Sequence, residues 1–388
     1  MIERKIRKVL DMLTGEYPVI TITGPRQSGK TTLAQTHFPS YAYANLEDPE
    51  IRSLAENDAR EFFRRHPAPV VIDEIQRVPG LLSHIQARAD QERLNGRYIL
   101  TGSQQLGLRA AVSQSLAGRT AILQLLPLSV EELSGAGRGV DRDELLHKGF
   151  MPKIHGANVN VEQLYRNYFL TYVERDVRQL VNIRNLSHFE VFLKLLAGRV
   201  GQVANLSSLS NDVGVSATTL GEWLSALEAS YIVFRLPPYF ENFGKRLVKS
   251  PKLYFVEVGL AAYLLGIKSP EQAARDPLLG GLFENLVVVE ALKARYNAGL
   301  DSGLHFFRDS RGLEVDLLLN HGRKLLPIEI KAARSFNASF ADGVERFRQA
   351  VPNAEGGAVV YAGDLTPTVK GVRFTHFTGT AKLMESVC

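Results

Sequence analysis

Residues 24–31, GPRQSGKT, decide the fold of the first part of this chain. They fit G-x-x-x-x-G-K-[ST] at every fixed position, and they lie between an apolar, β-branched run at 17–23 and a helix-like segment that begins at Thr31. In this context the motif predicts a phosphate-binding loop, whose backbone N–H groups surround the phosphates of a nucleotide. Lys30 is then expected to reach the outer phosphates, and the Thr31 hydroxyl to bind Mg²⁺. The loop residues predicted to bind ATP are Gly24, Pro25, Arg26, Gln27, Ser28, Gly29, Lys30, Thr31 and Thr32.

Two acids follow another short apolar strand, as a magnesium–ATP site requires. In the sequence VVIDE we expect Asp73 to bind the magnesium ion and Glu74 to polarise the attacking water. Ser103 ends the next strand, in YILTGS, where it is expected to contact the γ-phosphate or that water. Arg119 is a candidate arginine finger, which would stabilise charge on the transferred phosphoryl group. The alternative interpretation of Arg119 is an arginine that simply faces solvent.

Apolar runs without polar alternation recur over the first 126 residues, and helical patterns separate most of them. The predicted strands are 17–23, 41–46, 70–72, 97–101 and 121–126. Continuously apolar strands between helices are typical of a parallel sheet that is buried on both faces. The sequence therefore predicts an α/β nucleotide-binding domain, which ends near the glycine- and charge-rich stretch around Gly135.

Residues 205–227 have the rhythm of a helix-turn-helix, with a turn at Gly214 and an N-cap at Ser216. A hairpin-like stretch at 231–255 would form the wing of a winged helix. The two helices carry no Lys or Arg, so the second one is poorly suited to reading DNA bases. The wing is basic and interleaved with aromatic residues, so contact with nucleic acid and interdomain packing both remain open. Its basic residues are Arg235, Lys245, Arg246, Lys249 and Lys252.

A second group of acids gathers in the last third of the chain. Asp316 lies in EVDLLL, and Glu329 and Lys331 share one face of the later strand IEIK. The turn NHGR should bring Asp316 beside Glu329, and Glu284 on the preceding apolar helix would add a third acid. Such a set suits a magnesium-dependent nuclease, in which Glu284, Asp316 and Glu329 bind the metal and Lys331 orients or activates water. The alternative is the solvated polar face of an edge hairpin.

The composition is that of an ordinary globular protein, with 45% hydrophobic and 22% charged residues. The net charge of +5 is too small an excess to establish a polyanionic partner. The single cysteine, Cys388, excludes an internal disulfide and a cysteine-built zinc site. No apolar run approaches the length of a membrane helix, and the N-terminus lacks a signal peptide's apolar stretch. We therefore expect a cytoplasmic protein without a membrane partner.

The segments GPRQSGKTT, NLEDPEIR, VVIDEIQRVP, YILTGSQQ and SLAGRTAILQLLPLSVEEL, in this order, resemble the AAA-type ATPase domain of a widespread prokaryotic family. Its members carry a C-terminal domain of unknown function, and YVERDV, KLYFVEVGL, GGLFENLV, GLEVDLLL and PIEIKAA match its later landmarks. Two positions depart from the pattern. Glu257 stands where an aspartate is expected, and a glycine-aromatic-proline-glutamate element ends in Lys153 instead of an acid. The C-terminal acids are similar to the active site of restriction-endonuclease-like domains, whose helix-strand-strand-strand-helix-strand order also matches.

Four segments are expected from these patterns and from the resemblance. They are a P-loop AAA-type ATPase domain (1–135), a linker and helical region (136–200), a winged-helix domain (201–262) and a restriction-endonuclease-like α/β domain (263–388). The leading hypothesis is a Mg-ATP-hydrolysing ATPase, a homo-oligomer, whose cycle repositions the C-terminal half on DNA. The alternative is a nucleotide-gated switch that binds a protein partner while the nuclease-like site is inert, since such sites can degenerate and keep the fold.

Overall fold

The computed structural model describes residues 2–103, 115–177, 185–240 and 250–386. The chain divides into two compact units. The first comprises Met1–Leu128, Ala229–Tyr231 and Tyr296–Leu300, and the second comprises Ser129–Glu228, Ile232–Arg295 and Asp301–Cys388. Among the described residues, no helix is both long and apolar enough to cross a membrane. The finer boundaries at 135, 200 and 262 stay predictions.

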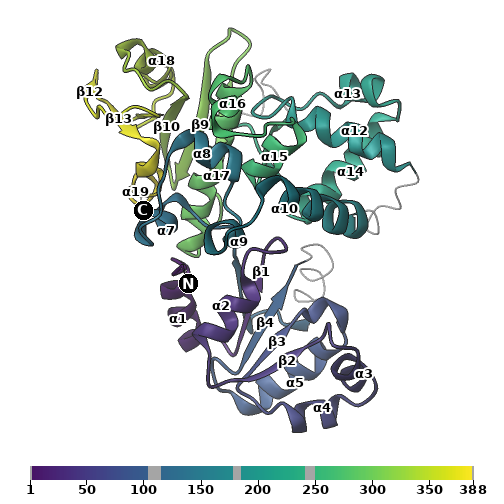
Figure 1. Cartoon of the computed structure of the whole chain (residues 1–388). Coiled ribbons are helices and arrows are strands. Elements are labelled where there is room, and N and C mark those ends of the chain that lie inside the picture. The colour runs from purple at the N-terminus through teal and green to yellow at the C-terminus, as the bar shows by residue number, and fades with distance from the viewer. Residues whose placement is uncertain (1, 104–114, 178–184, 241–249, 387–388) are drawn as a thin grey trace. The chain divides into compact units, whose positions relative to one another are not determined.

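An all-parallel, five-stranded sheet forms the centre of the first unit (Figure 1). Its strands lie in the order β2-β3-β4-β1-β5. They are β1 (Val19–Thr23), β2 (Ala42–Asn45), β3 (Val70–Asp73), β4 (Tyr98–Gly102) and β5 (Thr120–Gln124). Every residue of β1, β3 and β4 is buried, as the unbroken apolar runs predicted. The predicted α/β class with a parallel-sheet P-loop ATPase fold is therefore confirmed for this unit.

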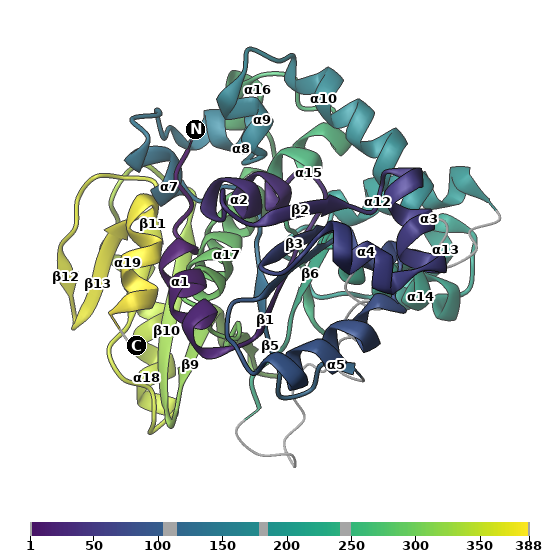
Figure 2. The same cartoon turned by 90° about the horizontal axis from the view of Figure 1, so that it is seen from below.

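Helices cover both faces of this sheet (Figure 2). They are α1 (Arg7–Glu16), α2 (Lys30–His37), α3 (Pro49–Asn57), α4 (Ala59–Arg65) and α5 (Leu81–Glu92). Successive side chains of a strand point to opposite faces, so neighbouring residues of β1 enter different cores. Ile20 packs in the core that α1 and α2 cover, whereas Val19 packs in the core that α3, α4 and α5 cover.

Mostly short helices open the second unit. They are α7 (Val130–Gly135), α8 (Arg142–Lys148), α9 (Pro152–Gly156), α10 (Val161–Tyr168), the π-helix Phe169–Val177, α12 (Leu186–Ala197), α13 (Leu206–Val213), α14 (Ala217–Ala229), α15 (Val258–Leu264) and α16 (Pro270–Arg275). Two helices joined by a short turn lie where the helix-turn-helix was expected. Helix α13 ends at Gly214, which has φ +79°, and the Ser216 hydroxyl accepts the Thr219 N–H at 3.1 Å before α14. Strands β6 (Val233–Leu236) and β7 (Lys252–Phe255) pair antiparallel. Residues 241–249 of the predicted wing lie outside the described residues, so the winged-helix identity stays a prediction.

A six-stranded mixed sheet in the order β12-β13-β11-β10-β9-β8 completes the second unit (Figure 1). Its strands and helices are α17 (Leu279–Asn297), β8 (Leu304–Arg308), β9 (Glu314–His321), β10 (Lys324–Lys331), α18 (Asp342–Ala350), β11 (Ala358–Tyr361), β12 (Thr368–Val369), β13 (Val372–His376) and α19 (Thr380–Glu385). From α17 to β11 they follow the predicted helix-strand-strand-strand-helix-strand order. His321 pairs with Lys324, so a two-residue turn at Gly322 and Arg323 closes the expected hairpin. The restriction-endonuclease-like identity itself stays a prediction.

Candidate functional site

The predicted phosphate loop lies at the carboxyl end of β1, directly before α2. Gly24 has φ +150°, and a Cβ atom built there would lie 2.1 Å from the Leu125 carbonyl oxygen. Gly29 has φ +91° and forms the N-cap of α2. Side chains are therefore excluded from the first position by space and disfavoured at the second by backbone conformation. The two glycines of the motif are required by the structure of the loop itself.

Lys30 is buried in this loop, with 6% of its surface exposed. Its Nζ atom donates hydrogen bonds to the Gly24 carbonyl at 3.0 Å and to the Pro25 carbonyl at 2.7 Å. Burial lowers the pKa of Lys30 to about 8, although the nearby Glu74 and Asp73 oppose that shift. The Ser28 hydroxyl oxygen is also buried, and it has no hydrogen-bond partner among the described residues. A buried cation and an unsatisfied hydroxyl beside a backbone curve fit the phosphates of a nucleotide.

Asp73 ends β3 and is 3% exposed. The Thr31 hydroxyl donates to its Oδ2 atom at 2.8 Å, and the Tyr43 hydroxyl of β2 donates to the same oxygen at 2.9 Å. The Thr101 hydroxyl of β4 donates to the other oxygen. The structure thus brings together the two residues predicted to hold Mg²⁺, and their adjacent oxygens fit that ion. Sequence reasoning missed Tyr43, whose pKa is raised by burial and by Asp73.

Glu74 follows in the left-handed conformation, with φ +59°. Its carboxylate accepts a hydrogen bond from the Gln76 amide, and the Ser103 hydroxyl donates to the same oxygen at 3.4 Å. The Gln76 amide also donates to Ser103 at 3.2 Å. Ser103 therefore lies next to the predicted water-polarising acid, and its predicted contact with the γ-phosphate or the water stays a prediction. Gln76 is a neighbour that the sequence analysis did not single out.

Arg119 lies elsewhere in the first unit. It precedes β5, whose register pairs Val19 with Thr120 at one end and Thr23 with Gln124 at the other. The phosphate loop follows Thr23 at the carboxyl end of the strands, so Arg119 lies at their opposite, amino-terminal end. There it forms a two-point ion pair with Asp90 of α5, at 2.5 and 2.9 Å. Within one chain the structure does not bring Arg119 to the phosphate loop, and a role in a neighbouring subunit stays a prediction.

The C-terminal acids gather in the second unit, on three different elements. Glu284 comes from α17, Asp316 from β9 and Glu329 from β10, and the Ile330 N–H donates to Asp316 Oδ2 at 2.9 Å. Lys331 is paired with Glu329 at 2.5 Å, and its side chain is 38% exposed. Burial, with Asp316 next in effect, raises the pKa values of both Glu284 and Glu329 to about 7. The predicted hairpin geometry is thus observed.

Lys252 of β7 is the unexpected member of this cluster. Its Nζ atom lies 2.9 Å from Glu284 Oε1, 2.9 Å from Glu314 Oε1 and 3.6 Å from Asp316 Oδ1. Although the sequence analysis counted Lys252 among the wing's basic residues, it is only 3% exposed. Burial lowers its pKa, but the three carboxylates outweigh that effect and raise the pKa above the ordinary value. The missed signal was the alternation in KLYF, which puts Lys252 and Tyr254 on one strand face.

The arrangement does not fit a metal ion at the three predicted ligands. Within the part of the chain that the structure describes, no group of three or more His, Cys, Asp or Glu side chains is placed to hold a metal. The physical reason is the Lys252 ammonium, which lies within 2.9 Å of Glu284 and 3.6 Å of Asp316. The lysine ammonium therefore occupies the position between Glu284 and Asp316 that a metal ion bound by both acids would take.

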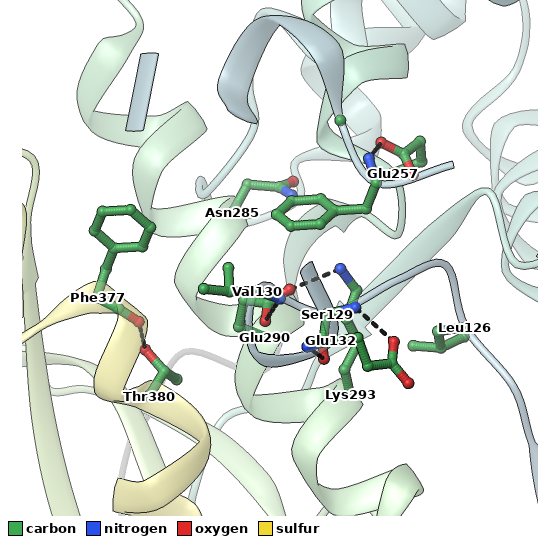
Figure 3. A network of polar contacts seen from close by, with 12 residues as sticks. Leu126, Ser129, Val130, Glu132, Glu257, Asn285, Glu290, Lys293, Phe377 and Thr380 are labelled. Atoms are coloured by element: carbon green, nitrogen blue, oxygen red, sulfur yellow. Dashed lines mark hydrogen bonds and ion pairs between the residues drawn. The ribbon is translucent and has the colours of Figure 1, made fainter. Parts of the chain in front are cut away.

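Another polar network joins α17 to the start of the second unit (Figure 3). Lys293 pairs with Glu290 at 2.7 Å, and the second oxygen of Glu290 accepts the Val130 N–H at 2.7 Å. Both charged side chains are almost fully buried. Glu290 and Lys293 are paired and buried, so this network holds the segment that begins at Ser129 against α17.

Glu257, the residue that departs from the family pattern, is buried as well. It accepts the Phe150 N–H at 2.8 Å and the Tyr165 hydroxyl at 3.0 Å, and burial raises its pKa. Gly149 has φ +68°, and a Cβ atom there would lie 1.8 Å from Glu257 Oε1. The glutamate therefore holds the GFMPK element against α15. Lys153 of that element is exposed on α9.

Three family models match the chain. One is described as an AAA domain (residues 16–134), one as a domain of unknown function, DUF8612 (140–271), and one as a domain of unknown function, DUF4143 (279–378). The chain is 31% identical over 324 residues to the uncharacterized protein Rv2008c of Mycobacterium tuberculosis, a match that covers 81% of this chain and 70% of the relative. An uncharacterized protein of Haemophilus influenzae is 24% identical over 343 residues, covering 80% and 81%.

Among solved structures, the Walker-type ATPase PABY2304 of Pyrococcus abyssi is 13% identical to this chain. The match covers 68% of this chain and 96% of that structure, with a TM-score of 0.46.

Proposed function

The chain belongs to the family of the mycobacterial protein Rv2008c, with an AAA domain ahead of a DUF4143 domain, and from that premise we propose that it binds Mg-ATP and hydrolyses it. The observation that carries the proposal is the hydrogen bond between Thr31 and Asp73, beside the buried Lys30 and at the end of β1. Two strands of one parallel sheet, β1 and β3, bring these groups together at their carboxyl ends.

Each residue of the site has a distinct part in this reaction. Lys30 exchanges its two loop carbonyls for phosphate oxygens, while Thr31 and Asp73 hold the magnesium ion. When bound, Mg²⁺ neutralises charge on the outer phosphates. Glu74 orients the attacking water and accepts its proton. Ser103 donates a hydrogen bond to the Glu74 carboxylate, so its hydroxyl lies where it can also contact the γ-phosphate.

Two substitutions test this proposal in different steps. Lys30→Ala should reduce ATP turnover by about 10²–10³-fold or more, because charge stabilisation on the transferred group is lost. Glu74→Gln should still bind ATP but lose hydrolysis, which equilibrium binding and phosphate release measure separately. Glu50→Gln, an exposed acid on α3, is the matched control and should behave as wild type. Wild-type turnover in Lys30→Ala would contradict the assignment.

The output of the ATPase has two candidates. Action on DNA through the second unit is the one that the sequence favoured. A nucleotide-gated switch on a protein partner, with an inert nuclease-like site, is favoured by the position of Lys252 and by Arg235, which pairs with Glu228 and is not a free basic residue of the wing. ATP turnover measured with and without DNA separates them. Stimulation by DNA supports the first, and an unchanged rate supports the second.

A further inference from the structure

We propose that Lys252 is the resident cation of the C-terminal carboxylate cluster, standing in the place of a divalent metal ion and closing the cluster to metals. The cluster comprises Glu284, Glu314, Asp316 and Glu329. The inference does not depend on ATP hydrolysis, because it concerns only contacts within the second unit. It agrees with the absence of a suitable metal-holding group among the described residues.

Three of the carboxylate oxygens in the cluster already have partners. Glu284 Oε1 accepts from Lys252 at 2.9 Å and from the Tyr254 hydroxyl at 2.6 Å. One oxygen of Asp316 faces Lys252 at 3.6 Å, and the other accepts the Ile330 N–H at 2.9 Å. A divalent ion bound at Glu284 Oε1 and Asp316 Oδ1 would lie close to the Lys252 ammonium, and the repulsion between the two cations opposes such binding while the lysine is in place.

The position of Lys252 is fixed by the backbone around it. Asn285, which is fully buried and adjacent to Glu284 on α17, accepts the Phe255 N–H at 2.6 Å and donates to the Phe255 carbonyl at 2.8 Å. These two bonds hold β7 against α17. On the other side, the Gly201 N–H donates to the Leu253 carbonyl at 2.9 Å, and a Cβ atom at Gly201 would lie 3.3 Å from Glu284 Oε2. The lysine is therefore delivered by a docked strand rather than by a free side chain.

Charge explains why the cation is needed. Four carboxylates in one partly buried cluster repel one another, and charges that are removed from water are tolerated best when they are paired. Lys252 contacts three of the four, whereas Lys331 pairs with Glu329 and is partly exposed. The two lysines are thus unequal. Lys252 fills the interior of the cluster, and Lys331 neutralises its outer edge.

The test compares Lys252→Met with Lys331→Met in the full-length, nucleotide-free protein. Thermal unfolding is followed with and without Mn²⁺. Any stabilisation by Mn²⁺ bound at the phosphate loop should be the same in both variants and in wild type, so a difference between them reports on the acid cluster. Removing Lys252 should open the carboxylates, so Mn²⁺ at about 100 times its Kd should raise the Tm of Lys252→Met by about 5 °C more than that of wild type. Lys331→Met should respond as wild type does, and adding Asp316→Asn to Lys252→Met should remove the extra response.

A second measurement covers the case in which Lys252→Met does not fold. Mn²⁺ stoichiometry is determined by titration for wild type and for Asp316→Asn. A cluster closed by Lys252 takes no metal, so both proteins should bind the same number of ions. One additional ion bound by wild type would overturn the proposal. A folded Lys252→Met without an extra Mn²⁺ response would also overturn it.

Discussion

The low pKa of Lys30 predicts that ATP affinity falls as pH rises above 8. In the nucleotide-free protein, burial lowers this pKa to about 8, so the lysine loses its proton well below its ordinary range. Phosphate binding requires the charged form. Between pH 7.5 and 9.5 the protonated fraction drops from about 0.76 to about 0.03, which predicts a Kd about 25-fold higher, or about 1.9 kcal/mol. The triphosphate adds little to this change, because phosphate groups are already deprotonated in that range.

The same shift has a defined sign for stability. The folded protein binds this proton less strongly than the unfolded chain, so the contribution of Lys30 to the free energy of unfolding rises with pH between about 8 and 10.5. The nucleotide-free protein should therefore gain stability from this group over the same range in which ATP binding weakens.

Equilibrium titration with a fluorescent ATP analogue and magnesium, repeated at several pH values, measures the affinity. Lys30→Met should bind weakly and without the fall, because the titrating group is gone. Lys8→Met, an exposed lysine on α1, is the matched control and should keep the full pH dependence. A wild-type Kd that stays constant from pH 7.5 to 9.5, or a fall of equal size in Lys30→Met, would refute the reasoning.

Three further predictions concern other parts of the chain. If Arg119 acts on a neighbouring subunit, mixing Arg119→Ala with Glu74→Gln should restore part of the ATP turnover; a mixture as inactive as its components would remove that role. Gly149→Ala should destabilise the second unit by more than about 3 kcal/mol, because its Cβ atom would lie 1.8 Å from Glu257 Oε1; denaturant unfolding at the wild-type midpoint would contradict this. Tyr165→Phe should lose about 2–3 kcal/mol in the same assay, because the hydroxyl bonds to Glu257 and to a backbone carbonyl at 2.8 Å disappear; a change below 0.5 kcal/mol, the scale of a neutral surface substitution, would count against it.

The nucleotide site could be predicted because its chemistry is local. The phosphate loop and the Asp73–Glu74 pair each follow an apolar strand, and parallel strands present their carboxyl ends at one edge of a sheet. Arg119 shows the limit of this logic. The predicted strand 121–126 already begins after Arg119, but a candidate arginine finger was inferred without asking at which end of that strand it lies. The parallel register of β5 with β1 puts it at the end away from the phosphate loop.

The acid cluster shows a second limit. The alternation in the β9–β10 hairpin was enough to place Asp316 near Glu329. Lys252 was misread because its partners are 32 or more positions away along the chain, on α17 and β9. A local count of charges assigned it to the basic residues of the wing. Only the docking of β7 on α17 makes it part of the acid cluster.

The ion cluster around Lys252 also constrains how this family can diverge. Exchange of the lysine alone leaves three partly buried carboxylates without their shared cation, and exchange of an acid alone leaves the buried lysine with one partner fewer. Neutral drift is therefore expected to pass through paired replacements at 252 and at 284, 314 or 316. Comparison of many relatives at these four positions should divide the family into two groups. One group keeps a lysine at 252 together with the acids, and the other lacks the lysine and has acids that are free to bind a metal ion.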